Sequence, residues 1–193
     1  MSPTHLKPEN FTTSTWAGGA TTQLFIWPEG ASYAERNFDF RISIAKVETE
    51  TSDFTALPGF NRKLMILEGE IKIHHENQYS KTLKAFDVDA FKGEWKTNSA
   101  GTCTDFNVMT AEGLQSDLYS ILLPKGDKHL LSTEKHWKTL LIYVFEGEIT
   151  VEANNFKQEI SKGHALVFQE LDATPILLKA KKDSRIVFAL LDK

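Results

Sequence analysis

The chain contains 193 residues, of which 41% are hydrophobic and 25% are charged, and its formal net charge is −4. Its lysines and arginines are scattered, which excludes the concentrated basic face of a nucleic-acid-binding protein. The polar N-terminus lacks the apolar core of a signal peptide, and no apolar run approaches the ~20 residues of a membrane span. Cys103 is the single cysteine, so an internal disulfide is excluded, as in proteins of the reducing cytosol. We therefore expect a cytoplasmic protein without membrane or nucleic-acid partners.

The first informative stretch is W-A-G-G-A-T, from Trp16 to Thr21. Adjacent glycines allow the backbone to approach another group closely, but their spacing is not that of a dinucleotide or phosphate loop. Two interpretations stay open. The stretch forms a tight turn with Trp16 packed as a lid, or a loop in which Trp16 and Thr21 line a pocket. A short strand, residues 22–28, follows and ends at Pro28.

From Phe38 to Val47 apolar and polar residues alternate, which predicts a strand. Arg41 and Ser43 share one face of it. A buried arginine needs a partner, so Arg41 either pairs with Asp39 or contacts a ligand, and both can hold together.

The run L-M-I-L-E-G, residues 64–69, is apolar on both faces and predicts a strand buried on both sides. Arg62 lies just before it, in phase with Leu64 and Ile66. Two arginines, Arg41 and Arg62, thus interrupt strands that otherwise belong to a core. This pattern predicts a small-molecule pocket inside a β-barrel.

In the strand around T-D-F-N-V-M-T, residues 104–110, Asp105 and Asn107 point to the same side. They can offer acceptors and a donor to a ligand, or they can stabilise a turn at the start of the strand. A connector over residues 111–118, a strand from Tyr119 and a loop over residues 125–137 follow. We expect little helix, because no stretch shows a sustained helical period with caps.

The chain contains an internal repeat. L-M-I-L-E-G-E-I-K-I, from Leu64, matches I-Y-V-F-E-G-E-I-T-V, from Ile142, 78 residues later. L-K-A-F-D-V-D-A-F, from Leu83, matches I-S-K-G-H-A-L-V-F, from Ile160, 77 residues later. Two offsets that agree so closely indicate a duplicated β unit.

A strand, an E-G-E turn, a second strand and a K-G-H-A turn resemble the cupins, which are barrels of the jelly-roll type. The predicted fold is therefore all-β, a bicupin of two double-stranded β-helix barrels. We expect an N-terminal half over residues 1–110 and a C-terminal half over residues 111–193, joined in a single compact domain.

The chain also resembles the HutD/Ves proteins, which are small bicupins. The resemblance rests on W-x-G-G-x-T, F-D-F-R-I-S-I-A, F-T-A-L-P-G-F-N-R, L-E-G, F-K-G and D-F-N-V-M, which begin at residues 16, 38, 54, 67, 91 and 105. Ala20 stands where the family often has a glycine, and T-A-E-G after Met109 lacks expected basic residues. The resemblance implies a small-molecule binder, with ligands such as urocanate or formylglutamate from histidine utilisation.

A cupin metal site is not expected. Metal-binding cupins place a glutamate ahead of the E-G-E glycine, and the corresponding positions here are Arg62 and Leu140. Adjacent His74 and His75 point to opposite faces of a strand and cannot chelate together. An arginine at the ligand position favours an anion instead, because a guanidinium can clamp a carboxylate with two hydrogen bonds.

These features predict a metal-independent bicupin without a cofactor that binds a small carboxylate metabolite, in a regulatory or accessory role. The expected ligand-binding residues are Trp16, Thr21, Arg41, Ser43, Arg62, Asp105 and Asn107. Two alternatives stay open. One is a metal-independent isomerase or hydrolase with Asp105 or Glu94 as its acid–base group. The other is an interaction protein whose barrel mediates a homodimer.

Overall fold

The computed structural model describes residues 3–134, 136–172 and 174–193. Within these ranges nearly all regular structure is β-strand, and the helical element is a 3-10 turn at Pro8–Asn10. The all-β prediction is confirmed. No helix in the described part of the chain has the length and apolar character needed to cross a membrane.

The chain divides into two compact units. We call residues 11–114 the N-terminal unit, and residues 1–10 together with 115–193 the C-terminal unit. The sequence places the boundary at nearly the same point, between residues 110 and 111. It does not anticipate that the first ten residues join the C-terminal unit, where Thr4–Leu6 pairs with Ala165–Val167. The expectation of a single compact domain stays a prediction.

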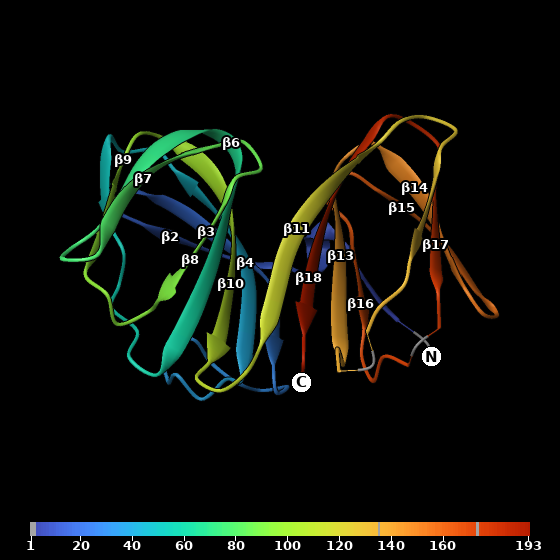
Figure 1. Cartoon of the computed structure of the whole chain (residues 1–193), viewed down its shortest axis with the longest axis horizontal. Helices are drawn as coiled ribbons and strands as arrows, with labels where there is room; N and C mark the ends of the chain where they lie inside the picture. Colours follow the sequence, from blue (N-terminus) through green and yellow to red (C-terminus); the bar gives the residue numbers. More distant parts are fainter. Residues whose placement is uncertain (1–2, 135, 173) are drawn as a thin grey trace. The chain divides into compact units, whose positions relative to one another are not determined.

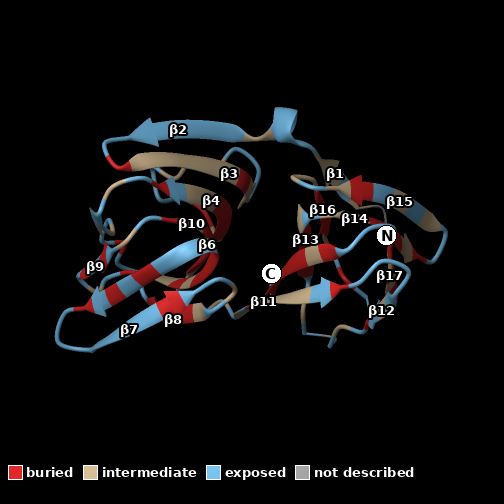
Figure 2. Cartoon of the chain, turned by 90° about the horizontal axis from the view of Figure 1, so that it is seen from above, coloured by how far each residue is buried: buried red, intermediate tan, exposed pale blue. Residues whose placement is uncertain are grey.

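The N-terminal unit is built around one long strand, β6 (Figure 1). Its main sheet has the order β2-β3-β4-β10-β6-β9-β5, and β7 and β8 also pair with β6. Figure 2 shows that β2 is exposed along its length and that β10 is largely buried. The strands are β2 (Thr12–Trp16), β3 (Gly19–Trp27), β4 (Phe40–Val47), β5 (Thr51–Asp53), β6 (Phe60–His75), β7 (Tyr79–Lys84), β8 (Val88–Lys92), β9 (Thr97–Ala100) and β10 (Cys103–Ala111).

The C-terminal unit has two sheets, with strand orders β1-β16-β13-β18-β11 and β12-β17-β14-β15. An apolar cluster that draws side chains from both sheets forms the core of this unit. The strands are β1 (Thr4–Leu6), β11 (Ser116–Leu123), β12 (Lys128–Leu131), β13 (Thr139–Glu146), β14 (Glu148–Ala153), β15 (Phe156–Ser161), β16 (Ala165–Phe168), β17 (Ile176–Ala180) and β18 (Ser184–Leu191).

The local predictions are mostly confirmed. Leu64, Met65, Ile66 and Leu67 are all buried, as a run that is apolar on both faces requires. Several short strands escaped prediction, among them β2 and β5, whose composition is polar, and β12, which lies within the expected loop over residues 125–137. All three lie at sheet edges, where one side of a strand faces solvent.

The internal repeat is also a structural repeat. The backbone amide of Phe86 donates to the carbonyl of Ile66, and at the matching positions Gly163 donates to Val144. The reverse bonds match as well, since Ile66 donates to Asp87 and Val144 donates to His164. Equivalent backbone bonds show that the two halves share one local architecture.

The two E-G-E glycines have the same role in both halves. Gly69 and Gly147 have φ angles of +86° and +89°, in the left-handed region that disfavours a Cβ atom. A Cβ added to Gly69 would collide with the carbonyl of Thr102, and one added to Gly147 with the carbonyl of Asp183. Glycine is therefore required at each position for two reasons, the left-handed φ angle and the close approach of another backbone segment.

We expect Gly69→Ala or Gly147→Ala to lower the free energy of unfolding by about 3 kcal/mol or more. The left-handed conformation accounts for about 1–2 kcal/mol of this, and the backbone collision accounts for the rest. Urea denaturation measures the effect. Gly59 and Gly126 are matched controls, because their φ values are +81° and +88° but an added Cβ meets nothing within 4 Å. Equal losses at all four positions would contradict the collision argument.

Candidate functional site

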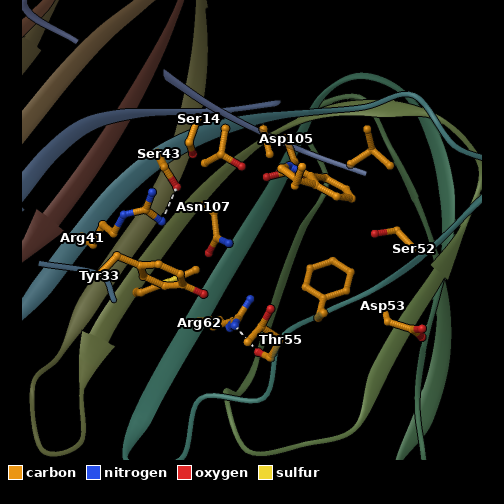
Figure 3. Close-up of a pocket in the computed structure, with 16 residues that line it drawn as sticks. Ser14, Tyr33, Arg41, Ser43, Ser52, Asp53, Thr55, Arg62, Asp105 and Asn107 are labelled. Carbon is orange, nitrogen blue, oxygen red and sulfur yellow. Dashed lines mark hydrogen bonds between the residues drawn. The ribbon is translucent and has the colours of Figure 1, made fainter. Parts of the chain in front are cut away.

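The N-terminal unit contains a cavity of about 340 Å³. All seven residues expected to bind a ligand line it, although they come from β2, β3, β4, β6 and β10 (Figure 3). They are Trp16, Thr21, Arg41, Ser43, Arg62, Asp105 and Asn107. Their convergence is a structural finding, and their contact with a ligand stays a prediction.

Arg41 projects from β4 and is buried, with 7% of its surface exposed. Its Nε donates to Oε1 of Gln23 at 2.8 Å, and one terminal nitrogen donates to Oγ of Ser43 at 3.4 Å. The guanidinium carbon lies 4.5 Å from the centre of the Tyr33 ring, within the range of a cation–π interaction. These partners are neutral, so they hold the guanidinium in place without compensating its charge.

Arg62 projects from β6 and is 4% exposed. One terminal nitrogen donates to the carbonyl of Thr55 at 2.5 Å, and the guanidinium carbon lies 5.8 Å from the centre of the Phe54 ring. Its Nε has no hydrogen-bond partner among the described residues. A buried donor without a partner costs free energy, so this nitrogen is available to a ligand.

Arg41 and Arg62 lie at the same level of the sheet. In β10, Met109 pairs with Arg41 of β4 on one side and with Arg62 of β6 on the other. The two arginines therefore stand two strand spacings apart, about 10 Å at the backbone. Burial lowers the pKa of both guanidiniums, and the charge of Arg62 also lowers the pKa of Arg41. Guanidinium pKa values start so high that both groups remain cations.

Two acceptors face the same cavity from β10. Oδ1 of Asp105 and Oδ1 of Asn107 are buried and lack hydrogen-bond partners among the residues described here. Complete burial raises the pKa of Asp105 to about 7, although the charge of Arg62 acts in the opposite direction. Asp105 is therefore a carboxyl group that changes its charge near neutral pH.

Trp16 lines the cavity from the end of β2 and is 40% exposed. Gly18 follows it in the hairpin, where an added Cβ would collide with the Trp16 ring. The residues W-A-G-G thus form a tight turn, and Trp16 also lines the cavity. The structure thus combines the tight turn with a cavity-lining Trp16, and the role of Trp16 as a lid stays a prediction.

The C-terminal unit carries apolar side chains at the positions equivalent to Arg62, Asp105 and Asn107, whereas the equivalent of Arg41 is the exposed Asp117. The residue equivalent to Arg62 is Leu140, which pairs with Leu190 as Arg62 pairs with Met109. By the same register Ile186 replaces Asp105, and Phe188 replaces Asn107.

The position of Ser43 is occupied by Tyr119, which stacks on Phe188 with ring centres 5.0 Å apart. Leu140, Ile186 and Phe188 are completely buried in the apolar cluster. The same backbone thus carries a polar cavity in one unit and a packed core in the other.

Sequence reasoning missed several residues of the cavity wall. Tyr33 comes from a loop without periodicity, so no pattern could place it. Phe54 and Thr55 belong to the quoted run F-T-A-L-P-G-F-N-R, but their contacts with Arg62 depend on how that loop folds back. Glu94, considered as an acid–base group, is exposed in a turn and is not among the residues that line the cavity.

Within residues 3–134, 136–172 and 174–193, no group of three or more histidine, cysteine or acidic side chains is arranged to hold a metal ion. His74 is exposed and His75 is buried, so they point to opposite faces as expected. His75 contacts Oγ1 of Thr97 at 2.7 Å and Oδ2 of Asp89 at 2.9 Å, within a buried network apart from the cavity. The expectation that no metal is required stays a prediction.

Comparison with known proteins supports the predicted family and fold. Protein Ves from Escherichia fergusonii is 35% identical over 102 residues, which cover 49% of this chain and 51% of that protein. The chain thus spans about half the length of this curated relative.

Two solved structures show the same fold. HutD from Pseudomonas fluorescens SBW25 aligns with a TM-score of 0.77 and 16% identity, over 98% of each chain. A cupin 2 conserved barrel domain protein from Leptotrichia buccalis aligns with a TM-score of 0.59 and 15% identity, over 97% of this chain and 96% of the other. The predicted cupin fold is confirmed.

The HutD family model matches residues 8–188, nearly the whole sequence. This chain belongs to the HutD family.

Proposed function

We propose that the N-terminal unit binds a small carboxylate metabolite in its polar cavity, in a regulatory or accessory role in the cytoplasm. A histidine-catabolism intermediate such as urocanate or N-formylglutamate has the required chemistry. The observation that carries this proposal is the pair of buried arginines, because neither Gln23, Ser43 nor Thr55 compensates their charge. A carboxylate would supply that charge and accept from the free Nε of Arg62.

The C-terminal unit also supports a ligand-binding role for the buried arginines. Its apolar core shows that this architecture packs well without arginines. Burying two cations and an acid is costly, so their presence in the N-terminal unit points to a role other than stability. The HutD structure from Pseudomonas fluorescens was described under a formate condition, and formate is the smallest carboxylate.

A second candidate is a metal-independent isomerase or hydrolase acting on a small carboxylate. It is favoured by Asp105, because a carboxyl group with a pKa of about 7 can both accept and donate a proton at neutral pH. Turnover of a bound carboxylate, followed by NMR, separates this candidate from a binding protein. Loss of that turnover in Asp105→Asn, with ligand binding retained, would support the enzyme.

We expect N-formylglutamate, urocanate or formate to raise the melting temperature of the protein. A ligand that binds the native state alone stabilises it by about 2.7 kcal/mol at 100 times its Kd. Arg62→Leu, which introduces the residue found at the equivalent position 140, should weaken binding by about tenfold to a hundredfold. This range corresponds to the loss of charge-assisted hydrogen bonds. Thermal shift and calorimetric titration measure both effects.

Arg36→Gln is the control for total charge, because Arg36 is exposed and is not among the residues that line the cavity. It should leave ligand binding unchanged. Formamide, which is uncharged, should not stabilise the wild-type protein. The proposal fails if none of the three carboxylates shifts the melting curve, or if Arg62→Leu responds like the wild type.

Asp105 should make the protein less stable as the pH rises. Its folded pKa of about 7 lies above the ordinary value of 3.8, so its stabilising contribution is complete below about pH 4 and is lost as the pH passes 7. Relative to Asp105→Asn, we expect the wild type to lose on the order of 4 kcal/mol between pH 4 and pH 8.

Urea denaturation at several pH values tests this loss. Asp127→Asn is the control, because Asp127 is exposed and belongs to the C-terminal unit. It should follow the wild-type curve. Parallel curves for the wild type and Asp105→Asn would show that Asp105 titrates as an ordinary carboxyl group.

A further inference from the structure

The arrangement around Asp105 has an imbalance of hydrogen-bonding groups. Oδ1 of Asp105 and Oδ1 of Asn107 are two buried acceptors on neighbouring inward positions of one strand, and neither has a partner in the described structure. A proton on Asp105 would convert one of these acceptors into a donor. Nothing comparable is available at the equivalent Ile186 and Phe188 of the C-terminal unit.

The charges that face Asp105 come from several elements. On β10 itself the neighbour is Cys103, and burial raises the pKa of its thiol to about 12. Cys103 therefore stays neutral in the physiological range. The other charged or titratable groups around the cavity are Arg41 on β4, Arg62 on β6, Asp53 on β5 and Tyr33 in the loop before β4.

Arg62 is the charge that favours ionised Asp105. This electrostatic effect does not involve a hydrogen bond between Nε of Arg62 and Oδ1 of Asp105, since neither atom has a hydrogen-bond partner among the described residues. The other carboxyl group, Asp53, is exposed and can remain hydrated.

A carboxylate that enters this cavity changes the environment of Asp105 in two ways. It compensates the charge of Arg62, so that Arg62 supports ionised Asp105 less. It also adds a second negative charge to the same enclosed space, where water screens charges poorly. Two carboxylates that share a buried site favour protonation of one of them.

We propose that carboxylate binding in this cavity is coupled to the uptake of one proton by Asp105, so that the protein takes up an anion and a proton together. This inference rests on the proposed function and extends it to the regulation of the site. The proton comes from the solvent, and no covalent bond other than the O–H bond of Asp105 forms. Protonated Asp105 can then donate to the bound carboxylate or to Oδ1 of Asn107.

The sign of the coupling follows from these states. Below about pH 6 Asp105 is already protonated in the free protein, so binding needs no further proton and the affinity is highest. Above pH 7 each binding event must protonate Asp105. The affinity should then fall by up to about tenfold per pH unit. The cavity would thus release its ligand as the pH rises.

Calorimetric titration with N-formylglutamate tests this coupling, because that ligand has no group that titrates between pH 6 and pH 9. Formate serves as a second probe. Titrations in pairs of non-phosphate buffers whose ionisation enthalpies differ, HEPES and Tris at pH 7.5 and MES and Bis-Tris at pH 5.5, give the number of protons exchanged. We expect the wild type to take up about one half to three quarters of a proton per ligand at pH 7.5 and close to none at pH 5.5. This comparison within the wild type requires no variant.

Asp105→Asn should bind with no proton uptake at either pH, and its Kd should change little between pH 6 and pH 8. Asp53→Asn, which removes the other carboxyl group of the cavity, should retain the wild-type uptake, as should Asp127→Asn. Uptake that persists in Asp105→Asn would overturn the assignment.

Wild-type binding without uptake, or with proton release, would overturn the coupling and leave carboxylate binding intact. If neither N-formylglutamate nor formate binds at any pH, the proposed function itself fails, and the coupling fails with it.

Discussion

The N-terminal unit depends on the burial of two positive charges inside a β-barrel. Arg41 and Arg62 are almost completely removed from solvent, yet their hydrogen-bond partners are neutral. Other features of the cavity respond to this constraint. Tyr33 and Phe54 present aromatic faces to the guanidiniums, and Asp105 supplies an acid that is only partly ionised near neutral pH. A cluster of buried apolar side chains, which includes Leu64 and Ile66, accompanies these charges in the same unit.

The two units have similar backbones but different side chains at the positions that line the cavity of the N-terminal unit. They share the E-G-E glycine, its conformation and the backbone bonds around it. They differ at a few inward positions of equivalent strands, where Arg62, Asp105 and Asn107 correspond to Leu140, Ile186 and Phe188. The C-terminal unit can therefore serve as an internal reference for what the barrel looks like when it is only a core.

Much of this could be predicted from sequence. The duplicated E-G-E pattern predicted the cupin fold, and strand alternation placed Arg41, Ser43, Asp105 and Asn107 on the sides of their strands that face the cavity. Alternation succeeds because side chains on a strand have a strict period of two. Strand alternation predicts the direction of a charged side chain inside a barrel as well as that of an apolar one.

The remainder depends on contacts that no local pattern encodes. Tyr33 reaches Arg41 from an irregular loop, and β1 pairs with a strand about 160 residues away. The strands β2 and β5 lie at sheet edges, so they need no apolar face and resemble loops in composition. The pKa of Asp105 depends on complete burial, which becomes visible only in three dimensions.

The placement of β1 bears on how the protein is made. This strand is synthesised before the N-terminal unit, but its partner β16 is synthesised only after that whole unit and most of the C-terminal unit. The N-terminal unit can fold as soon as residue 114 has emerged, since domains generally fold during synthesis. The first residues must then wait without a partner. Among the strand pairings of the described residues, that of Thr4–Leu6 therefore has the longest interval between synthesis and pairing.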